Sequence, residues 1–258
     1  MKQPELWRPT KFVPVREGYR ASRDPKEVAP TSRLVTDRLA QVYPEALRRH
    51  ARGALLDLGC GAVPLFGVYR NLVTDVVCVD WAARGEVSHL DHAVDLNNPI
   101  PLPDARFDTI LATDVLEHIS RPAHLFMEIA RLLRPDGVLI AGVPFLYWIH
   151  EEPHDYYRYT EFALRRLCEG SGLTVLSVDP YGGGLEVALD TIAKTATYGR
   201  LGASFLGRWT VGALVLLGQA CLATRLARRV SRATARSMPL GYCLIATKPG
   251  ARGGATGA

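Results

Sequence analysis

Cysteines are few in this sequence and follow no pattern. The five stand at positions 60, 78, 168, 221 and 243, and no two have the spacing of a metal or redox motif. An odd, scattered set argues against a disulfide framework and favours a reducing compartment. The first residues, Met1–Leu6, contain no apolar core, so no secretory signal is expected. We therefore expect a cytoplasmic protein.

Acidic residues are missing from one long stretch. Residues 191–240 contain eight basic residues and no Asp or Glu, although the net charge of the whole chain is only +5. The rest of the chain is therefore about −3, since eight positive charges lie in this stretch. The basic character belongs to one segment rather than to the whole fold.

A third glycine is missing from the turn after the first predicted strand. The apolar run 54–58 carries Asp57 near its end and leads into Gly59 and Gly61. Such a turn brings the end of a buried parallel strand close to a nucleotide-sized ligand. A dinucleotide site needs another glycine at position 64, where the sequence has Pro64. Because proline lacks the N–H that a pyrophosphate would use, a dehydrogenase is disfavoured.

The next apolar strand, Val76–Val79, also ends in a carboxylate. Asp80 follows the glycines by about twenty residues, the usual distance to a group that binds a ribose diol. A ligand with an adenosine but no phosphates loses nothing through Pro64. The two strands together suggest S-adenosylmethionine.

These residues resemble the motifs of class I S-adenosylmethionine-dependent methyltransferases. Asp57-x-Gly59-x-Gly61 resembles their first motif, Asp80 their ribose-binding acid, and Val94–Leu96 their adenine-edge segment. The stretch Phe107–His118 is similar to their fourth strand and its exit. The cofactor site that this resemblance implies contains Asp57, Gly59, Gly61, Asp80, Trp81, Asp95, Leu96 and Asp114. Two of these keep an alternative: Asp57 holds the methionine amino group or orders the turn, and Trp81 covers the adenine or is ordinary core.

The loop after the fifth predicted strand narrows the resemblance. The run Gly-Cys-Gly-x-x-Pro and the loop His150–Thr160 resemble a subgroup found near polysaccharide and glycolipid biosynthesis. The residues expected to line an acceptor site are Asp155, Tyr156, Tyr157 and Arg158. Arg158 either faces a phosphate or carboxylate of the acceptor, or pairs with a nearby carboxylate and orders the loop.

Three histidines are candidates for a catalytic base. Methyl transfer to a hydroxyl requires removal of its proton, and an unperturbed imidazole titrates near ~6.5. His118 follows the fourth strand, and His150 and His154 follow the fifth, at the sheet edge where ligands bind. We predict His154 or His150 as the base, with His118 as a further candidate or a structural hydrogen-bonding group.

A metal ion is not expected in this loop. Two histidines and three carboxylates lie within residues 150–155, but they lack the i, i+4 spacing of a helical metal motif. Pro153 also interrupts them.

Strands that alternate with helices predict a Rossmann-like α/β fold. Its seven-stranded, mostly parallel sheet has helices on both faces. By the resemblance, the last strand runs antiparallel between strands five and six. Ser32, Ser120 and Thr160 are expected to cap helices, and Pro44 to end or kink the first of them.

The expected organisation has five parts. They are an irregular arm over 1–30, a methyltransferase core over 31–183, a basic apolar helical insertion over 184–239, the last strand over 240–249, and a disordered tail over 250–258. The arm lies on the surface or folds over the substrate pocket.

The predicted insertion includes an uncharged stretch, Trp209–Thr224. Its sixteen residues are fewer than the ~20 that a bilayer span needs. A single crossing would also leave the last strand on the far side of the membrane from its sheet. The remaining alternatives are a helix at the membrane interface, which basic residues favour, and a packing or homodimer face. Nucleic-acid binding is disfavoured because aromatic residues for base stacking are few.

We therefore expect an S-adenosylmethionine-dependent methyltransferase that acts at or near the inner face of a membrane. The expected acceptor is a hydroxyl of a sugar, a glycolipid or a secondary metabolite. One alternative is C-methylation of a membrane quinone precursor, which needs less of a base. A second alternative is a protein that binds the cofactor without turnover, favoured by Val63, where the family often has glycine.

Overall fold

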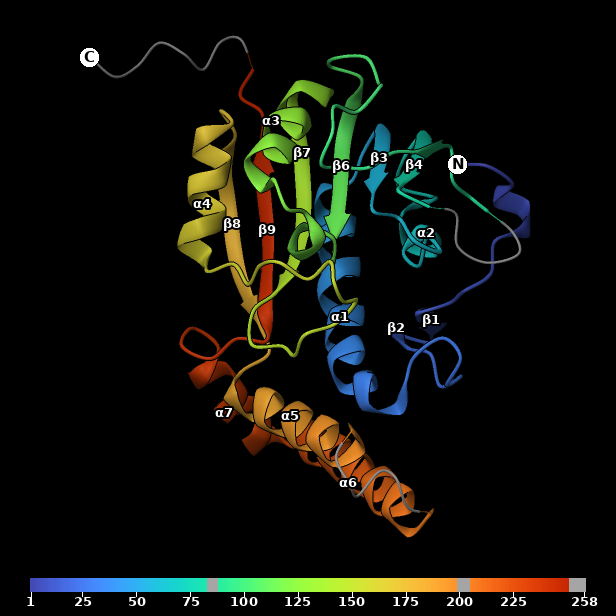
Figure 1. The fold of residues 1–258 in the computed structure, drawn as a ribbon, viewed down its shortest axis with the longest axis vertical. Helices are drawn as coiled ribbons and strands as arrows, with labels where there is room; N and C mark the ends of the chain where they lie inside the picture. The colour runs from blue at the N-terminus through green and yellow to red at the C-terminus, as the bar shows by residue number, and fades with distance from the viewer. Residues whose placement is uncertain (83–87, 199–204, 251–258) are drawn as a thin grey trace.

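A seven-stranded sheet forms the centre of the computed structural model, which describes residues 1–82, 88–198 and 205–250 (Figure 1). The strand order is β5-β4-β3-β6-β7-β9-β8. The strands are β3 (Ala54–Leu58), β4 (Asp75–Asp80), β5 (His92–Ala93), β6 (Phe107–Thr113), β7 (Leu133–Pro144), β8 (Thr174–Tyr181) and β9 (Gly241–Thr247). Only β9 runs antiparallel to its neighbours, β7 and β8; the other pairings are parallel. The predicted Rossmann-like fold is confirmed, including the position of the last strand.

Helices cover both faces of this sheet. In Figure 1, α3 (Pro122–Leu132) and α4 (Glu161–Gly170) lie in front of it and α1 (Arg33–His50) lies behind. The short α2 (Phe66–Tyr69) packs with α1. Side chains alternate along each strand, so Leu56 joins the core under α3 and α4 while Leu55 joins the core under α1.

Helix boundaries differ from the sequence prediction at three positions. Pro44 neither ends nor interrupts α1, which continues to His50, because Tyr43 and Leu47 beside it are fully buried. Ser120 does not cap α3; its hydroxyl donates to the Asn97 side chain, and the helix begins at Pro122. Ser32 precedes α1 without a side-chain cap, whereas Thr160 caps α4 as predicted, accepting from the Ala163 N–H.

The N-terminal arm is not irregular, contrary to the prediction. After a short 3-10 helix, η1 (Pro4–Leu6), strands β1 (Phe12–Val15) and β2 (Gly18–Ala21) form an antiparallel hairpin. The hairpin packs on α1 and buries Phe12 and Ala21. This burial explains why the segment forms regular strands. Prolines are compatible with such a two-stranded edge structure, because few of its N–H groups are paired.

In the described part of the insertion, three helices precede the last strand. They are α5 (Gly184–Tyr198), α6 (Phe205–Ala223) and α7 (Arg225–Thr234), and Figure 1 shows them beyond the end of the sheet to which the parallel strands point. None of the helices within the described residues has the length and apolar character that a bilayer crossing requires. The side chain of Trp209 and most of the predicted tail, residues 251–258, lie outside what the structure describes.

Candidate active site

A cavity of about 750 Å³ opens at the carboxyl ends of β3, β4 and β6. This volume lies within the usual range for small-molecule sites. The predicted site residues that line it are Asp57, Gly59, Gly61, Asp80, Trp81, Asp95, Leu96, Asp114, His118, His150, His154 and Tyr156. The chain thus brings together residues from the ends of its first five predicted strands at one edge of the sheet.

The glycine turn after β3 requires both of its glycines. Gly59 and Gly61 have φ of 67° and 53°, in the left-handed region that favours glycine. A Cβ on Gly59 would lie 2.3 Å from a methyl carbon of Val115. A Cβ on Gly61 would meet no described atom within 4 Å. Because Gly61 lines the cavity, a side chain there would occupy space that a ligand could use.

Asp80 is fixed at the end of β4 by two backbone hydrogen bonds. One carboxylate oxygen accepts from the Gly61 N–H at 2.8 Å, and the other accepts from the Trp81 N–H at 2.7 Å. The side chain of Trp81 is 54% exposed, so it is not ordinary core. Its ring lies 5.0 Å from the His154 ring, so the residue predicted to cover the adenine lies beside a candidate base.

The predicted adenine-edge pair is held in place by a short loop. The Asp95 carboxylate accepts from the Asn97 N–H and from the side-chain amides of Asn97 and Asn98. Leu96 is buried beside it and supplies an apolar wall to the cavity.

Asp57 is a buried carboxyl at the base of the cavity. Burial raises its pKa to about 7, although a 2.8 Å hydrogen bond from the Tyr69 hydroxyl opposes this shift. The charge of nearby Asp80 raises it further. Such a group is neutral or charged near neutral pH according to whether a cation lies beside it.

Asp114 connects the N-terminal arm to the site. Its backbone has φ of 53°, and its carboxylate accepts from Lys11 Nζ at 2.7 Å and from the Tyr43 hydroxyl at 2.6 Å. Lys11 and Phe12 of the arm line the cavity. Of the two alternatives for the arm, folding over the pocket is therefore the one that the structure shows.

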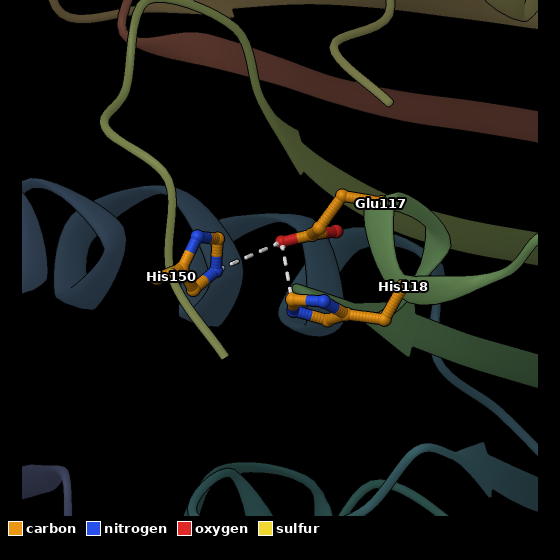
Figure 2. A group of neighbouring side chains, drawn as sticks. All are labelled: Glu117, His118 and His150. Atoms are coloured by element: carbon orange, nitrogen blue, oxygen red, sulfur yellow. Dashed lines mark ion pairs between the residues drawn. The ribbon is translucent and has the colours of Figure 1, made fainter. Parts of the chain in front are cut away.

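Glu117 lies between His118 and His150 (Figure 2). Its side chain is fully buried, and neither carboxylate oxygen has a hydrogen-bond partner among the described residues. Oε1 is 3.7 Å from Nε2 of each histidine. Burial raises the pKa of Glu117 well above its usual range, and the neighbouring Asp114 charge acts in the same direction.

The second nitrogen of each ring in this cluster faces an oxygen. Nδ1 of His118 lies 2.7 Å from the His154 carbonyl oxygen, which only accepts, so Nδ1 carries the proton. Nδ1 of His150 lies 3.2 Å from a carboxylate oxygen of Asp155. When the His118 ring is neutral, its Nε2 is therefore a hydrogen-bond acceptor, and this atom faces Glu117.

Three of the four predicted acceptor-binding residues do not line the cavity. Arg158 pairs with both carboxylate oxygens of Asp155, at 2.6 and 2.7 Å, and also donates to the Trp148 carbonyl. The structure thus shows the loop-ordering alternative for Arg158. Tyr157 instead donates to the Ser120 carbonyl at 3.3 Å. Asp155 thus pairs with Arg158 and also accepts from the His150 N–H, within the same loop.

Helix α5 supports the same loop from the side of the insertion. Lys194 Nζ, buried beside Asp190, lies 3.7 Å from the centre of the Tyr147 ring. The Tyr147 ring in turn lies 5.3 Å from the His150 ring. The helical insertion is therefore in contact with the candidate active site, which was not predicted from the sequence.

The fold and the cavity define a class I S-adenosylmethionine-dependent methyltransferase. A family model described as "Methyltransferase domain" matches residues 31–178, which is more than half of the chain, and the chain belongs to this family. This family implies S-adenosylmethionine as the cofactor, and the cavity fits it: Asp80 is fixed at its wall, and Gly61 leaves space beside it.

Similar proteins agree with this assignment. A "Ubiquinone biosynthesis O-methyltransferase" of Rhodopseudomonas palustris is 27% identical over 135 residues, which are 45% of this chain and 53% of that protein. The chain thus aligns with about half the length of such curated relatives. A methyltransferase structure from Archaeoglobus fulgidus has a TM-score of 0.51 at 14% identity, covering 81% of this chain and 94% of the other. The cyclase SpnF has a TM-score of 0.50 at 18% identity, covering 83% and 82%. At these identities the structural likeness establishes the fold alone.

Proposed function

We propose that this protein transfers a methyl group from S-adenosylmethionine to a hydroxyl oxygen of a small molecule. The observation that carries the proposal is the position of His118, His150 and His154 on the same cavity as Asp80. A ribose-binding carboxylate and several imidazoles thus meet within one site. Alkylation of carbon or sulfur would depend less on such a set of bases.

The cofactor residues are proposed as follows. Asp80 binds the ribose hydroxyls, the glycine turn of Gly59 and Gly61 lies against the cofactor, and Trp81 covers one face of the adenine. Asp95 and Leu96 lie at the adenine edge. Asp57 balances the positive charge of the methionine part, which its burial at the base of the cavity supports.

The chemistry needs one proton acceptor. When bound, the cofactor supplies a methyl group on a sulfonium; transfer forms a C–O bond, breaks the C–S bond with its electron pair on sulfur, and releases the hydroxyl proton. His154 is the proposed acceptor of this proton. Its ring lies beside Trp81 and has Nδ1 3.1 Å from the Tyr156 hydroxyl, so it is oriented at the cavity wall without a carboxylate partner among the described residues.

The proposed acceptor is an amphipathic molecule at a membrane surface. Helix α6 exposes Leu216 and Leu217, and α7 exposes Leu226 together with Arg228 and Arg229. Apolar side chains with cationic neighbours favour an anionic lipid surface. The resemblance of the 150–160 loop favours a sugar or glycolipid hydroxyl, whereas the names of the curated relatives favour a phenolic hydroxyl of a quinone precursor. Both are hydroxyl acceptors, so the proposed reaction is the same.

Calorimetric titration with S-adenosylmethionine and S-adenosylhomocysteine tests the cofactor site. Asp80→Ala removes a charged hydrogen-bonding group and should weaken binding by about 1.5–3 kcal/mol, or about 10- to 150-fold. Asp75→Ala is the matched control, because Asp75 lies at the opposite end of β4 and is exposed. Absence of binding to the wild type would overturn the proposal.

The acceptor is tested with membrane extracts and radiolabelled cofactor. We expect a labelled lipid product that is lost on His154→Ala, with cofactor affinity retained. C-methylation of a quinone precursor would instead be indicated by two results together. The label would resist ether cleavage, and the His154→Ala variant would still form the labelled product. Binding without any product would favour the alternative of a cofactor-binding protein.

A further inference from the structure

We infer that Glu117, His118 and His150 form a binding site for a divalent transition-metal cation, open toward the cavity. The site itself is independent of the reaction, whereas its role in catalysis rests on the proposed function. The three side chains come from two segments: Glu117 and His118 follow β6 in the 3-10 helix η3 (Leu116–His118), and His150 follows β7. All three line the cavity.

The donor atoms are close enough to share one ion. Oε1 of Glu117 and Nε2 of the two histidines lie within 4.8 Å of one another, and both Glu–His distances are 3.7 Å. Donors bound at about 2.1 Å to a single ion are about 3.0–3.5 Å apart. Small side-chain rotations therefore suffice to bring the three donors to bonding distance (Figure 2).

The orientation of the His118 ring is the one that metal-binding histidines show. Such rings usually direct their second nitrogen to a carbonyl or carboxylate oxygen, which fixes the tautomer and the ring plane. His118 directs Nδ1 to the His154 carbonyl, whereas Nδ1 of His150 lies 3.2 Å from a carboxylate oxygen of Asp155 without forming a hydrogen bond among the described residues. Asp155 is itself held by Arg158 through two short bonds. Nε2 of each ring is thus presented to the same point beside Glu117.

The buried carboxylate supplies an independent argument. Glu117 is fully buried, and its two side-chain oxygens have no hydrogen-bond partner among the described residues. A buried polar group usually has a partner, and a buried charge is usually paired or bound to a metal. A cation between Glu117 and the two Nε2 atoms would satisfy all three groups at once.

The donor set indicates the class of cation. Two imidazoles and one carboxylate suit Zn²⁺, Mn²⁺, Fe²⁺ or Co²⁺ better than Mg²⁺ or Ca²⁺, which prefer oxygen ligands. Three protein ligands leave positions open, as in catalytic rather than structural sites. The open side faces the cavity, so an acceptor hydroxyl can complete the coordination. A cation there would lower the pKa of that hydroxyl. The cation would also select acceptors whose hydroxyl can act as a metal ligand.

The test is direct metal binding to the full chain after dialysis against a chelator. Titration with Zn²⁺, Mn²⁺ or Co²⁺ should show one saturable equivalent. Glu117→Gln and His150→Asn should each weaken this binding at least ~100-fold. Asp155→Asn, which removes an outer partner, should weaken it about 10- to 100-fold. His92→Asn is the control, because this exposed histidine on β5 lies away from the cavity.

Three outcomes would overturn the site. The first is that none of the three cations shows saturable binding. The second is that both Glu117→Gln and His150→Asn leave the binding unchanged. The third is that the Co²⁺ spectrum of the wild type has a thiolate charge-transfer band. The last would place the ion on cysteines and needs no variant. S-adenosylhomocysteine binding is measured on the same chelated samples: if it is retained while metal binding is absent, the site is wrong and the proposed function stands. If the wild type binds metal but no cofactor, the proposed function is wrong and the site stands.

Discussion

Asp57 carries its carboxyl group where a negative charge is costly. Its pKa is about 7 in the folded protein, against an ordinary value of 3.8. Between these values the unfolded chain has lost the proton that the folded chain keeps, so the free energy of unfolding should fall as pH rises. One group contributes at most about 1.4 kcal/mol per pH unit. Denaturant unfolding of the cofactor-free protein across this pH window measures the slope.

Asp57→Asn separates this effect from other titrating groups. The amide keeps the hydrogen bond to Tyr69 but cannot ionise, so the fall in stability with pH should become smaller. Asp75→Asn, at an exposed position, should leave the slope unchanged. Equal slopes for the wild type and Asp57→Asn would show that the carboxyl titrates normally.

Several site residues can be predicted from the sequence because strand ends are visible in it. Apolar runs locate Gly59, Gly61 and Asp80, and parallel strands bring their carboxyl ends to one edge. Glu117 follows such a strand too, but its complete burial depends on packing from distant segments. The sequence argument against a metal considered residues 150–155 alone, whereas the structure places His150 beside Glu117 and His118.

At the scale of elements, α5 is anchored by one buried carboxylate. Glu186 accepts from Arg38 of α1 and from Ser231 of α7, both at 2.7 Å, and from the Gly183 N–H at 3.1 Å. Glu186→Ala should lower the free energy of unfolding by about 3 kcal/mol, because it leaves these donors without their acceptor. Urea unfolding measures the change, with exposed Glu169→Ala on α4 as control. A loss equal to that of the control would mean that the insertion is held by apolar packing instead.

The arm is the element whose contribution to the site is tested most easily. Lys11→Met removes the cation beside Asp114 and should weaken cofactor or acceptor binding by about 5-fold, or about 1 kcal/mol, since the pair is partly exposed. Lys26→Met, on the same arm but outside the cavity lining, is the control. Calorimetry and KM measure the two affinities. No change in either would mean that the arm only covers the site.

The arm also shows the limit of element prediction. Its prolines suggest irregular structure, but a hairpin forms because Phe12 and Ala21 find a buried position on α1. Pro44 is a similar case, since the buried residues around it keep α1 continuous. Local preferences were overridden where a long-range contact buried enough surface.

At the scale of the whole molecule, the excess of positive charge belongs to the insertion and not to the methyltransferase core. We expect the protein to bind vesicles that contain anionic lipids and not neutral ones, through the insertion. Replacing Arg228 and Arg229 by glutamine should weaken binding by about 2 kcal/mol, or about 30-fold, at ~1 kcal/mol per residue. Cosedimentation measures the vesicle binding. Arg165 and Arg166 are two consecutive arginines on α4, and replacing both by glutamine provides a matched control. Equal losses for both pairs would indicate a non-specific charge effect.

The fold as a whole was predictable because its alternation of strands and helices is regular. The position of the insertion relative to the site was not, because contacts such as Lys194 with Tyr147 join segments far apart in the chain.

The position of β9 has a consequence for synthesis on the ribosome. Among the described residues, strand β8 pairs with β9 alone, yet β9 follows it only after the three helices of the insertion. At about 5–20 residues per second, the ribosome needs several seconds to make the chain between them. During that time β8 has no strand to pair with, and the edge of β7 is open. The nascent chain therefore exposes an unpaired sheet edge, and slower translation through the insertion should increase its demand for chaperones.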